Sequence, residues 1–185
     1  MNWEIQEKKI KSCNLCPGLN SAALGTENAP GYGDKNSEVM ILGQSLCGKP
    51  CIDAQIPFTG GSGKLLDDVF ELAGIEKKDV FTTNVVKCHP PGNRPSETHE
   101  IENCRSYLNN ELRWVSPKVI ICLGKDAWGF ANKAVNAECV ESVQLSGQAI
   151  TVHFLYHPSY IRRKPKKERD GYVAKIAKII SSAIA

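Results

Sequence analysis

Four short runs of apolar and β-branched residues recur along the chain and predict the strands of a sheet. The runs are EVMILG (38–43), VFTTNVV (80–86), KVIICLG (118–124) and AITVHFLY (149–156). The first three are apolar or β-branched almost without interruption, which is typical of parallel strands covered on both faces. We therefore expect a mainly parallel sheet buried between helices.

The segments between and after these runs have the spacing of amphipathic helices. In the first, over GKLLDDVFELAGI, Gly74 suits the helix end, and the apolar positions are Leu65, Leu66, Val69, Phe70 and Leu72. Ser96 is the expected N-cap of a helix over 96–115. Two more helices are expected over 125–135 and 169–185, the last with Val173, Ile176, Ile179 and Ile180 on one face. Alternating strands and helices predict an α/β sandwich, and 185 residues favour a single domain over 1–185.

Three stretches follow the carboxyl ends of predicted strands, where ligands bind in open sheets of this kind. They are GQSLCGKPC (43–51), NVVKCHPPGNRP (84–95) and HPSYIRR (157–163). We expect the functional residues among them.

Charge adds one local feature. The net charge of +3 is too small to indicate nucleic acid, but the chain has a dense basic run of Arg162, Arg163, Lys164, Lys166, Lys167 and Arg169. Such a run is usually a solvated helix start; its place directly after His-Pro-Ser favours a functional interpretation. No apolar stretch could span a bilayer, and residues 1–13 lack a signal-peptide core. We expect a cytoplasmic protein with no membrane association.

Eight cysteines in a chain expected in a reducing compartment point to metal or cluster ligation rather than to disulfides. Cys13 and Cys16 form a C-x2-C pair, Cys88 follows a strand, and Cys104 lies in the next helix. Four thiolates can hold zinc or an iron–sulfur cluster, and the 15 residues between Cys88 and Cys104 mildly favour the cluster.

The remaining cysteines carry weaker signals. Cys122 lies inside an apolar strand and is expected to be a small buried side chain, and Cys139 has no evident partner. Cys47 and Cys51 are either a second metal or redox pair or two unrelated thiols, and we favour unrelated thiols.

Three segments resemble the family-four uracil-DNA glycosylases, a group that carries an iron–sulfur cluster. They are TNVVKCHPPGNRPSETHEIENCRSYL (83–108), IPFTGGSGKLLDDVF (56–70) and YHPSY (156–160). The four cysteines at 13, 16, 88 and 104 match the family's cluster ligands in order and approximate spacing. The resemblance covers almost the whole chain.

The resemblance implies a three-layer αβα sandwich with a four-stranded parallel sheet, and a structural [4Fe-4S] cluster held by Cys13, Cys16, Cys88 and Cys104. It also implies base excision repair, in which uracil is excised from DNA by hydrolysis of the N-glycosidic bond, leaving an abasic site. The expected partner is DNA containing uracil, and we expect a monomer.

Each candidate site residue has a role in that chemistry. The enzyme must flip the base out of the stack and stabilise the uracil anion as it leaves. His157 is the candidate donor to uracil O2, the amide of Asn84 suits the O4 and N3–H edge, and Phe58 should stack on the base. The remaining substrate-binding candidates are Gly43, Gln44, Ser45 and Ser159.

The same stretches supply candidates for contact with DNA. Gly60, Gly61 and Gly63 can bring backbone amides close to phosphate. Tyr160, Ile161 and Arg162 could wedge into the gap left by the base, with Arg163 and the basic run behind them on phosphates.

The first family motif differs here. It is usually Gly-Glu-Ala-Pro-Gly, whereas this chain has Gly43-Gln44-Ser45-Leu46-Cys47. Gln44 cannot act as a general base, and Asp53 is the candidate to orient the attacking water. Two alternatives stay open: a relative that excises another deaminated base or only binds DNA, and an iron–sulfur redox protein that uses Cys47 and Cys51. Covalent trapping through His89 is not expected, because the basic insertion of relatives that trap DNA is missing.

Overall fold

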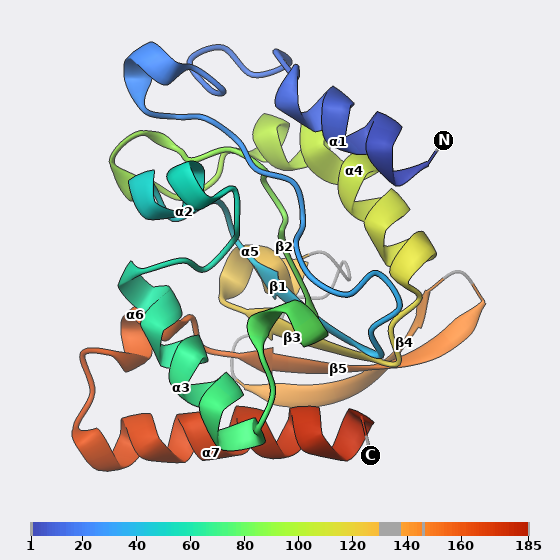
Figure 1. The fold of residues 1–185 in the computed structure, drawn as a ribbon, viewed down its shortest axis with the longest axis vertical. Coiled ribbons are helices and arrows are strands. Elements are labelled where there is room, and N and C mark those ends of the chain that lie inside the picture. The colour runs from blue at the N-terminus through green and yellow to red at the C-terminus, as the bar shows by residue number, and fades with distance from the viewer. Residues whose placement is uncertain (1, 130–137, 146, 185) are drawn as a thin grey trace.

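The computed structural model describes residues 2–129, 138–145 and 147–184, and these form a five-stranded sheet with helices on both faces (Figure 1). The strand order is β2-β1-β3-β5-β4. The strands are β1 (Val39–Gly43), β2 (Phe81–Asn84), β3 (Val119–Leu123), β4 (Cys139–Leu145) and β5 (Gln148–Leu155).

Four of the strands run parallel, as the resemblance implied. β1 lies between β2 and β3, and β5 pairs with the other side of β3. The register places Gly43 opposite Asn84 and Leu123 opposite Leu155, so these strands end at one edge of the sheet. The loops that follow them therefore meet there.

The fifth strand, β4, was missing from our expectation. It pairs antiparallel with β5 at the outer edge of the sheet. Its side chains alternate in exposure, with Val140 at 56% and Val143 at 9%. An edge strand with one wet face lacks the continuous apolar run by which the other strands were recognised.

The main helices are α1 (Trp3–Lys11), α2 (Lys49–Ala54), α3 (Lys64–Ala73), α4 (Thr98–Val115), α5 (Lys125–Trp128), α6 (Pro158–Ile161) and α7 (Lys166–Ile184). Short 3-10 helices cover Ala22–Leu24, Gly61–Gly63, Lys77–Asp79 and Pro91–Asn93. Part of the helix expected over 125–135 lies outside the described residues. No helix in the described part of the chain is long and apolar enough to cross a bilayer.

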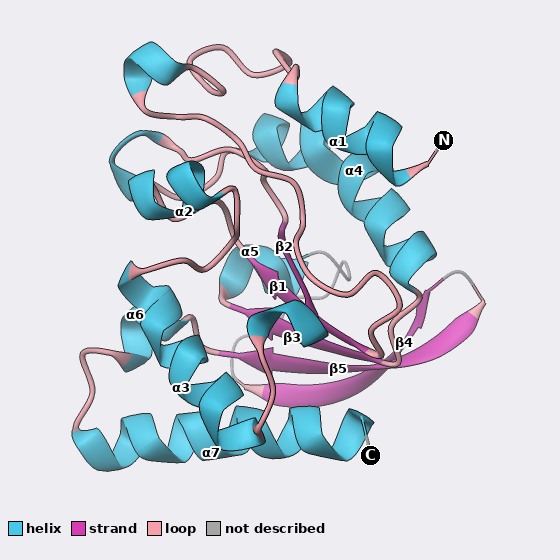
Figure 2. Ribbon diagram, viewed as in Figure 1, coloured by secondary structure: helices cyan, strands magenta, loops and turns pink. Residues whose placement is uncertain are grey.

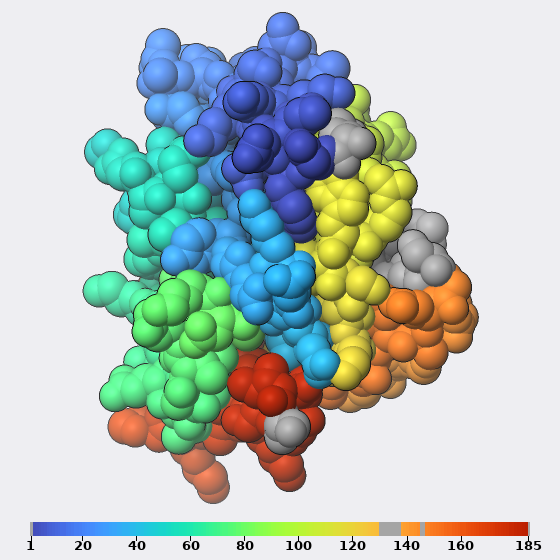
Figure 3. All heavy atoms as spheres, turned by 45° about the vertical axis from the view of Figure 1, so that its right-hand side comes forward, coloured from blue at the N-terminus to red at the C-terminus, as the bar shows by residue number. Residues whose placement is uncertain are grey.

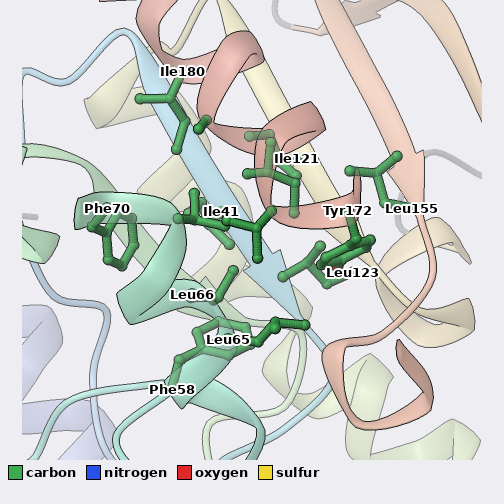
Figure 4. Packing of buried hydrophobic residues seen from close by; sticks show 14 of the residues in the cluster. Ile41, Phe58, Leu65, Leu66, Phe70, Ile121, Leu123, Leu155, Tyr172 and Ile180 are labelled. Carbon is green, nitrogen blue, oxygen red and sulfur yellow. The ribbon is translucent and has the colours of Figure 1, made fainter. Parts of the chain in front are cut away.

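Alternating side chains of β1 separate two apolar layers. Val39 and Ile41 pack with α3 and α7 on one face of the sheet, whereas Met40 and Leu42 face the layer of α4 and α5. Figure 2 shows the helices on either side of the strands, and Figure 4 shows the cluster between β1, α3 and α7. This confirms the three-layer αβα sandwich.

Two details of the expected helices were wrong. The N-cap of α4 is Glu97, not Ser96, because Glu97 and Glu100 form a reciprocal capping box. The backbone N–H of Ser96 instead lies 3.4 Å from Asp126 Oδ2. Leu72 is 60% exposed, so the apolar face of α3 consists of Leu65, Leu66, Val69 and Phe70.

The N-terminal chain lies outside the sheet and covers α4. Figure 3 shows residues of this chain, in blue, against those of α4, in yellow. Trp3 stacks near Phe81 and Trp114, and Gln6 exchanges hydrogen bonds with Tyr107 and Asn110. These contacts hold the segment that carries Cys13 and Cys16 close to α4.

Candidate active site at the carboxyl edge of the sheet

A cavity of about 830 Å³ lies at the edge where the parallel strands end. We call it the rim cavity. Seven predicted site residues line it: Gln44, Ser45, Gly61, His157, Ser159, Arg162 and Arg163. The lining also includes Asn93, Gly124, Lys125 and Asp126, which were not predicted. Parallel topology thus brings together loops that are far apart in the sequence.

His157 stands at the N-cap of α6, with its ring fixed by the next residues. The backbone N–H of Ser159 donates to His157 Nδ1 at 3.2 Å, and Ser159 Oγ lies 2.8 Å from the same nitrogen. Because Nδ1 accepts from a backbone amide, the ring proton belongs on Nε2. Burial lowers the pKa of His157, partly opposed by the negative charge of Asp126. The ring is therefore a neutral Nε2–H donor at the cavity.

Asn84 ends β2 and is only 3% exposed. Its side-chain Oδ1 is buried and has no hydrogen-bond partner among the described residues. Its backbone carbonyl, in contrast, accepts from Lys87 Nζ at 2.8 Å. A buried amide oxygen without a partner is costly, so a ligand donor at this point would be stabilising.

Gly43 and Phe58 lie against this amide. A Cβ at Gly43 would collide with both Asn84 Oδ1 and the edge of the Phe58 ring, so only glycine fits at this strand end. Phe58 has a left-handed backbone (φ 58°) and is 5% exposed. Lys77 Nζ donates to its carbonyl at 2.9 Å, and Figure 4 shows Phe58 at the end of the core cluster near Leu65. Phe58 is thus held in place from two sides.

Asn84 and His157 lie on the same edge of the sheet but not on neighbouring strands. β1 and β3 separate β2 from β5, which puts the two strand ends about 14 Å apart at the usual strand spacing of ~4.8 Å. His157 lines the rim cavity, whereas Asn84, Gly43 and Phe58 are not among its lining residues. Side chains and a bound ring must bridge this distance.

Asp53 lies away from the rim cavity. It is on α2 with its side chain 58% exposed, and it pairs with Lys49 at 2.9 Å, four residues earlier. The i,i+4 spacing on the helix brings these two exposed side chains together. Gly63 is also outside the lining, because it packs against the backbone of Phe58.

The predicted wedge residues differ in exposure. Ile161 is 7% exposed and packs in the core with α3 and α7, so it cannot enter a duplex without leaving that core. Tyr160 is 40% exposed, with its ring 5.2 Å from Tyr156 and Lys164 Nζ 4.7 Å above it. Of the apolar candidates, Tyr160 alone is available at the surface.

Four cysteines gather on the far side of the β2–α4 connection (85–97). Cys16, Cys88 and Cys104 form a buried cluster with Leu19 and Val86. Burial, together with the nearby thiols of Cys104, Cys13 and Cys16, raises the pKa of Cys88 to about 12. Asn103 Nδ2 donates to Cys16 Sγ at 3.3 Å. All four predicted ligands are therefore neighbours.

The cysteines do not converge on one point. Within the described ranges, no group of three or more His, Cys, Asp or Glu side chains has the spacing for a single metal ion. An iron–sulfur cluster is held by four thiolates, each bound to a different iron, so it requires thiols that surround a volume rather than a point. Four neighbouring thiols supply the donor atoms and the number of ligands that such a cluster takes.

The expectation that Cys47 and Cys51 are unrelated thiols was wrong. They form a disulfide across the start of α2, with their Cα atoms 5.9 Å apart. Cys47 lies just before the N-cap Gly48, and Cys51 lies in the first turn of α2. Cys122, as expected, is a fully buried residue of β3.

Comparison with known proteins places these features in context. A family model described as the uracil DNA glycosylase superfamily matches residues 30–180. A type-4 uracil-DNA glycosylase of Archaeoglobus fulgidus is 32% identical over 184 residues, covering 93% of this chain and 88% of that protein. A type-4 enzyme of Pyrobaculum aerophilum is 35% identical over 176 residues, covering 89% and 87%. A type-5 uracil-DNA glycosylase of the same organism is 32% identical over 149 residues, covering 70% and 65%.

Proposed function

The chain belongs to the uracil-DNA glycosylase superfamily, and on this premise we propose that it excises uracil from DNA at the carboxyl edge of the sheet, with the base held between Asn84 and the rim cavity. It is a hydrolase that cleaves the N-glycosidic bond and leaves an abasic site. The observation that carries the assignment of the site is Asn84 Oδ1, a buried acceptor without a partner among the described residues, beside the Phe58 ring.

The amide and the ring together suit one edge of uracil. A flipped uracil stacked on Phe58 would donate its N3–H to Asn84 Oδ1 and accept at O4 from Asn84 Nδ2. Cytosine has an acceptor at N3 and a donor at C4, so it would leave both amide groups mismatched. Cytosine is rejected strongly because its binding would leave buried polar groups of the site unpaired.

His157 acts on the leaving group. When the C1′–N1 bond breaks, its electron pair goes to uracil, and negative charge develops at O2. A neutral Nε2–H donor at that oxygen stabilises the anion without needing a protonated ring. Ser159 contributes by holding Nδ1 as an acceptor, which fixes both the tautomer and the ring orientation.

The cationic side of the rim cavity contacts the DNA backbone. Lys125, Arg162 and Arg163 line it, and charges of this kind bind phosphates in a salt-dependent manner. Tyr160, exposed next to them, is the candidate to fill the gap left by the flipped base. Lys166 contributes less, because it pairs with Asp170 at 2.6 Å.

The cysteine cluster has a separate role. We propose that Cys13, Cys16, Cys88 and Cys104 hold a [4Fe-4S] cluster. When bound, it would supply a covalent cross-link between the N-terminal chain, the β2–α4 connection and α4. Cys88 lies near the start of this connection, four residues after Asn84.

A cleavage assay tests the proposed function. Wild type, Asn84→Ala and His157→Ala are given oligonucleotides with uracil, hypoxanthine or xanthine, and abasic sites are revealed with alkali. We expect wild type to act on uracil and each variant to lose about 10²-fold in rate. Asn36→Ala and His99→Ala, both in exposed positions, are matched controls. Undiminished activity in Asn84→Ala and His157→Ala would contradict the assigned site.

A further inference from the structure

The loop after β1 lacks the carboxylate that hydrolysis needs. Cleavage of the N-glycosidic bond needs a water aligned with C1′ on the face opposite the leaving base, and a carboxylate commonly orients it. Position 44 is Gln, and Asp53 is exposed and paired with Lys49. Neither residue can supply a carboxylate to the rim cavity.

Asp126 does supply one. Among the described residues that line the rim cavity, it is the single Asp or Glu. It belongs to the first turn of α5, directly after the carboxyl end of β3. Gly124, with φ 89°, makes the turn between them, and a Cβ there would lie only 3.1 Å from His157 Cβ. The close approach places Asp126 on the His157 side of the rim.

The carboxylate of Asp126 has capacity for a water. Within the described chain it accepts a long hydrogen bond from the Ser96 N–H, 3.4 Å from Oδ2, whereas a carboxylate has about four acceptor positions. The Ser96 hydroxyl oxygen is itself buried and finds no partner among the described residues. Buried hydroxyls of this kind are commonly satisfied by an ordered water.

We propose that Asp126 is the catalytic carboxylate that orients the attacking water and accepts its proton, an inference that rests on the uracil excision proposed above. In this step the C1′–N1 bond breaks with its electron pair moving to uracil. The water oxygen forms the new bond to C1′, and the proton it loses goes to the Asp126 carboxylate and then to solvent. The released uracil anion takes up one proton, so the balance is DNA, water and no other reactant.

A purely structural role for Asp126 makes a different prediction. If it only anchored the 93–96 loop through Ser96, asparagine would preserve the contact, because an amide oxygen accepts the same N–H. If it accepts a proton from water, asparagine removes that ability while preserving shape. Asp126→Asn therefore separates the two roles.

The test is single-turnover excision of uracil by Asp126→Asn and Asp126→Ala. We expect a loss of about 10²-fold or more in both variants, with unchanged affinity for DNA that carries non-cleavable 2′-fluoro-deoxyuridine. Added formate, a small carboxylate, should restore part of the rate in Asp126→Ala. Asp68→Asn, on the exposed side of α3, is the matched control and should retain the wild-type rate.

The outcomes distinguish this inference from the function beneath it. If wild type and His157→Ala differ as expected but Asp126→Asn retains the wild-type rate, the role of Asp126 is overturned and uracil excision stands. A loss in Asp126→Ala that formate does not relieve, or a loss in Asp53→Asn in place of Asp126→Asn, also overturns it. If wild type releases no uracil, both the proposed function and this inference fail.

Discussion

The sheet edge at Asn84 and the cysteine cluster lie at opposite ends of the short turn 84–88, yet they are built in opposite ways. Asn84 lies beside Gly43 and Phe58, and Cys88, four residues later, is buried with Cys16 and Cys104. The sheet edge has a buried amide oxygen without a partner among the described residues, and the nearby rim cavity has a cationic lining. The cluster side is apolar and packed. One region is arranged to receive a ligand, whereas the other fixes the chain that presents it.

A buried ion pair connects the two regions. Lys87 Nζ donates to Glu111 Oε2 at 2.7 Å, to Thr83 Oγ1 at 2.7 Å and to the carbonyl of Asn84 at 2.8 Å. Both charged side chains are at most 2% exposed. A network this well satisfied is rigid, so it sets the position of the Asn84 backbone. The comparison therefore predicts that damage on the cluster side affects stability, whereas damage in the rim cavity affects rate.

The largest effect is expected on the cluster side. Cys88→Ala removes one of four proposed ligands and should abolish the visible absorption of the protein. Loss of a structural metal group belongs to the most destabilising class of changes, about 4 kcal/mol or more in the free energy of unfolding. Absorption spectra and urea unfolding measure it, with Cys139→Ser as the control that stays coloured. A colourless wild-type protein, purified without oxygen, would contradict the ligand assignment.

The next effect is expected at the connecting ion pair. Glu111→Ala leaves the Lys87 ammonium buried without its counter-charge, which should cost about 3 kcal/mol of unfolding free energy. Chemical denaturation measures the loss. Glu102→Ala, on the exposed side of the same helix, should change stability little. A loss in Glu111→Ala no larger than in Glu102→Ala would show that the pair does not hold the turn.

At the sheet edge beside Asn84, a methyl group added at Gly43 should lower the rate of excision. Gly43→Ala puts a methyl group against Asn84 Oδ1 and Phe58, and displacement of the base by about 1 Å can cost ~10²-fold in rate. Single-turnover kinetics and thermal unfolding are compared in the same variant. Gly171→Ala, which meets no heavy atom within 4 Å, is the control. Normal excision by Gly43→Ala would place the base elsewhere.

The smallest effect concerns pH. Burial lowers the pKa of His157 below its ordinary value of 6.5, so the ring stays neutral until the pH falls through that lowered value. The rate constant kcat/KM should therefore be level at and above pH 6.5 and decline only as the pH falls through the lowered pKa. Protonation would also remove the Nδ1 acceptor used by Ser159. A decline that already begins above neutrality, and is absent in His157→Ala, would contradict a neutral donor.

The sequence predicted the buried parallel strands and the site residues that directly follow them. β1 and β3 were recognisable because covered parallel strands are continuously apolar, and Gln44 and His157 because they follow such strands. β4 was missed because an edge strand with Val140 exposed has no such run. Lys125 and Asp126 directly follow β3 and obey the same strand-end rule, but no motif singled them out. The burial of Ile161 and the outward turn of Asp53 depend on tertiary packing, which no local pattern encodes.

The most direct test of the account is a crystal structure of the protein bound to DNA that contains 2′-fluoro-deoxyuridine, which is bound but not cleaved. The account predicts a flipped uracil stacked on Phe58, with its N3–H and O4 edge on the Asn84 amide and its O2 against His157 Nε2. A base that remains in the duplex, or one that contacts only His157 or only Asn84, would contradict it.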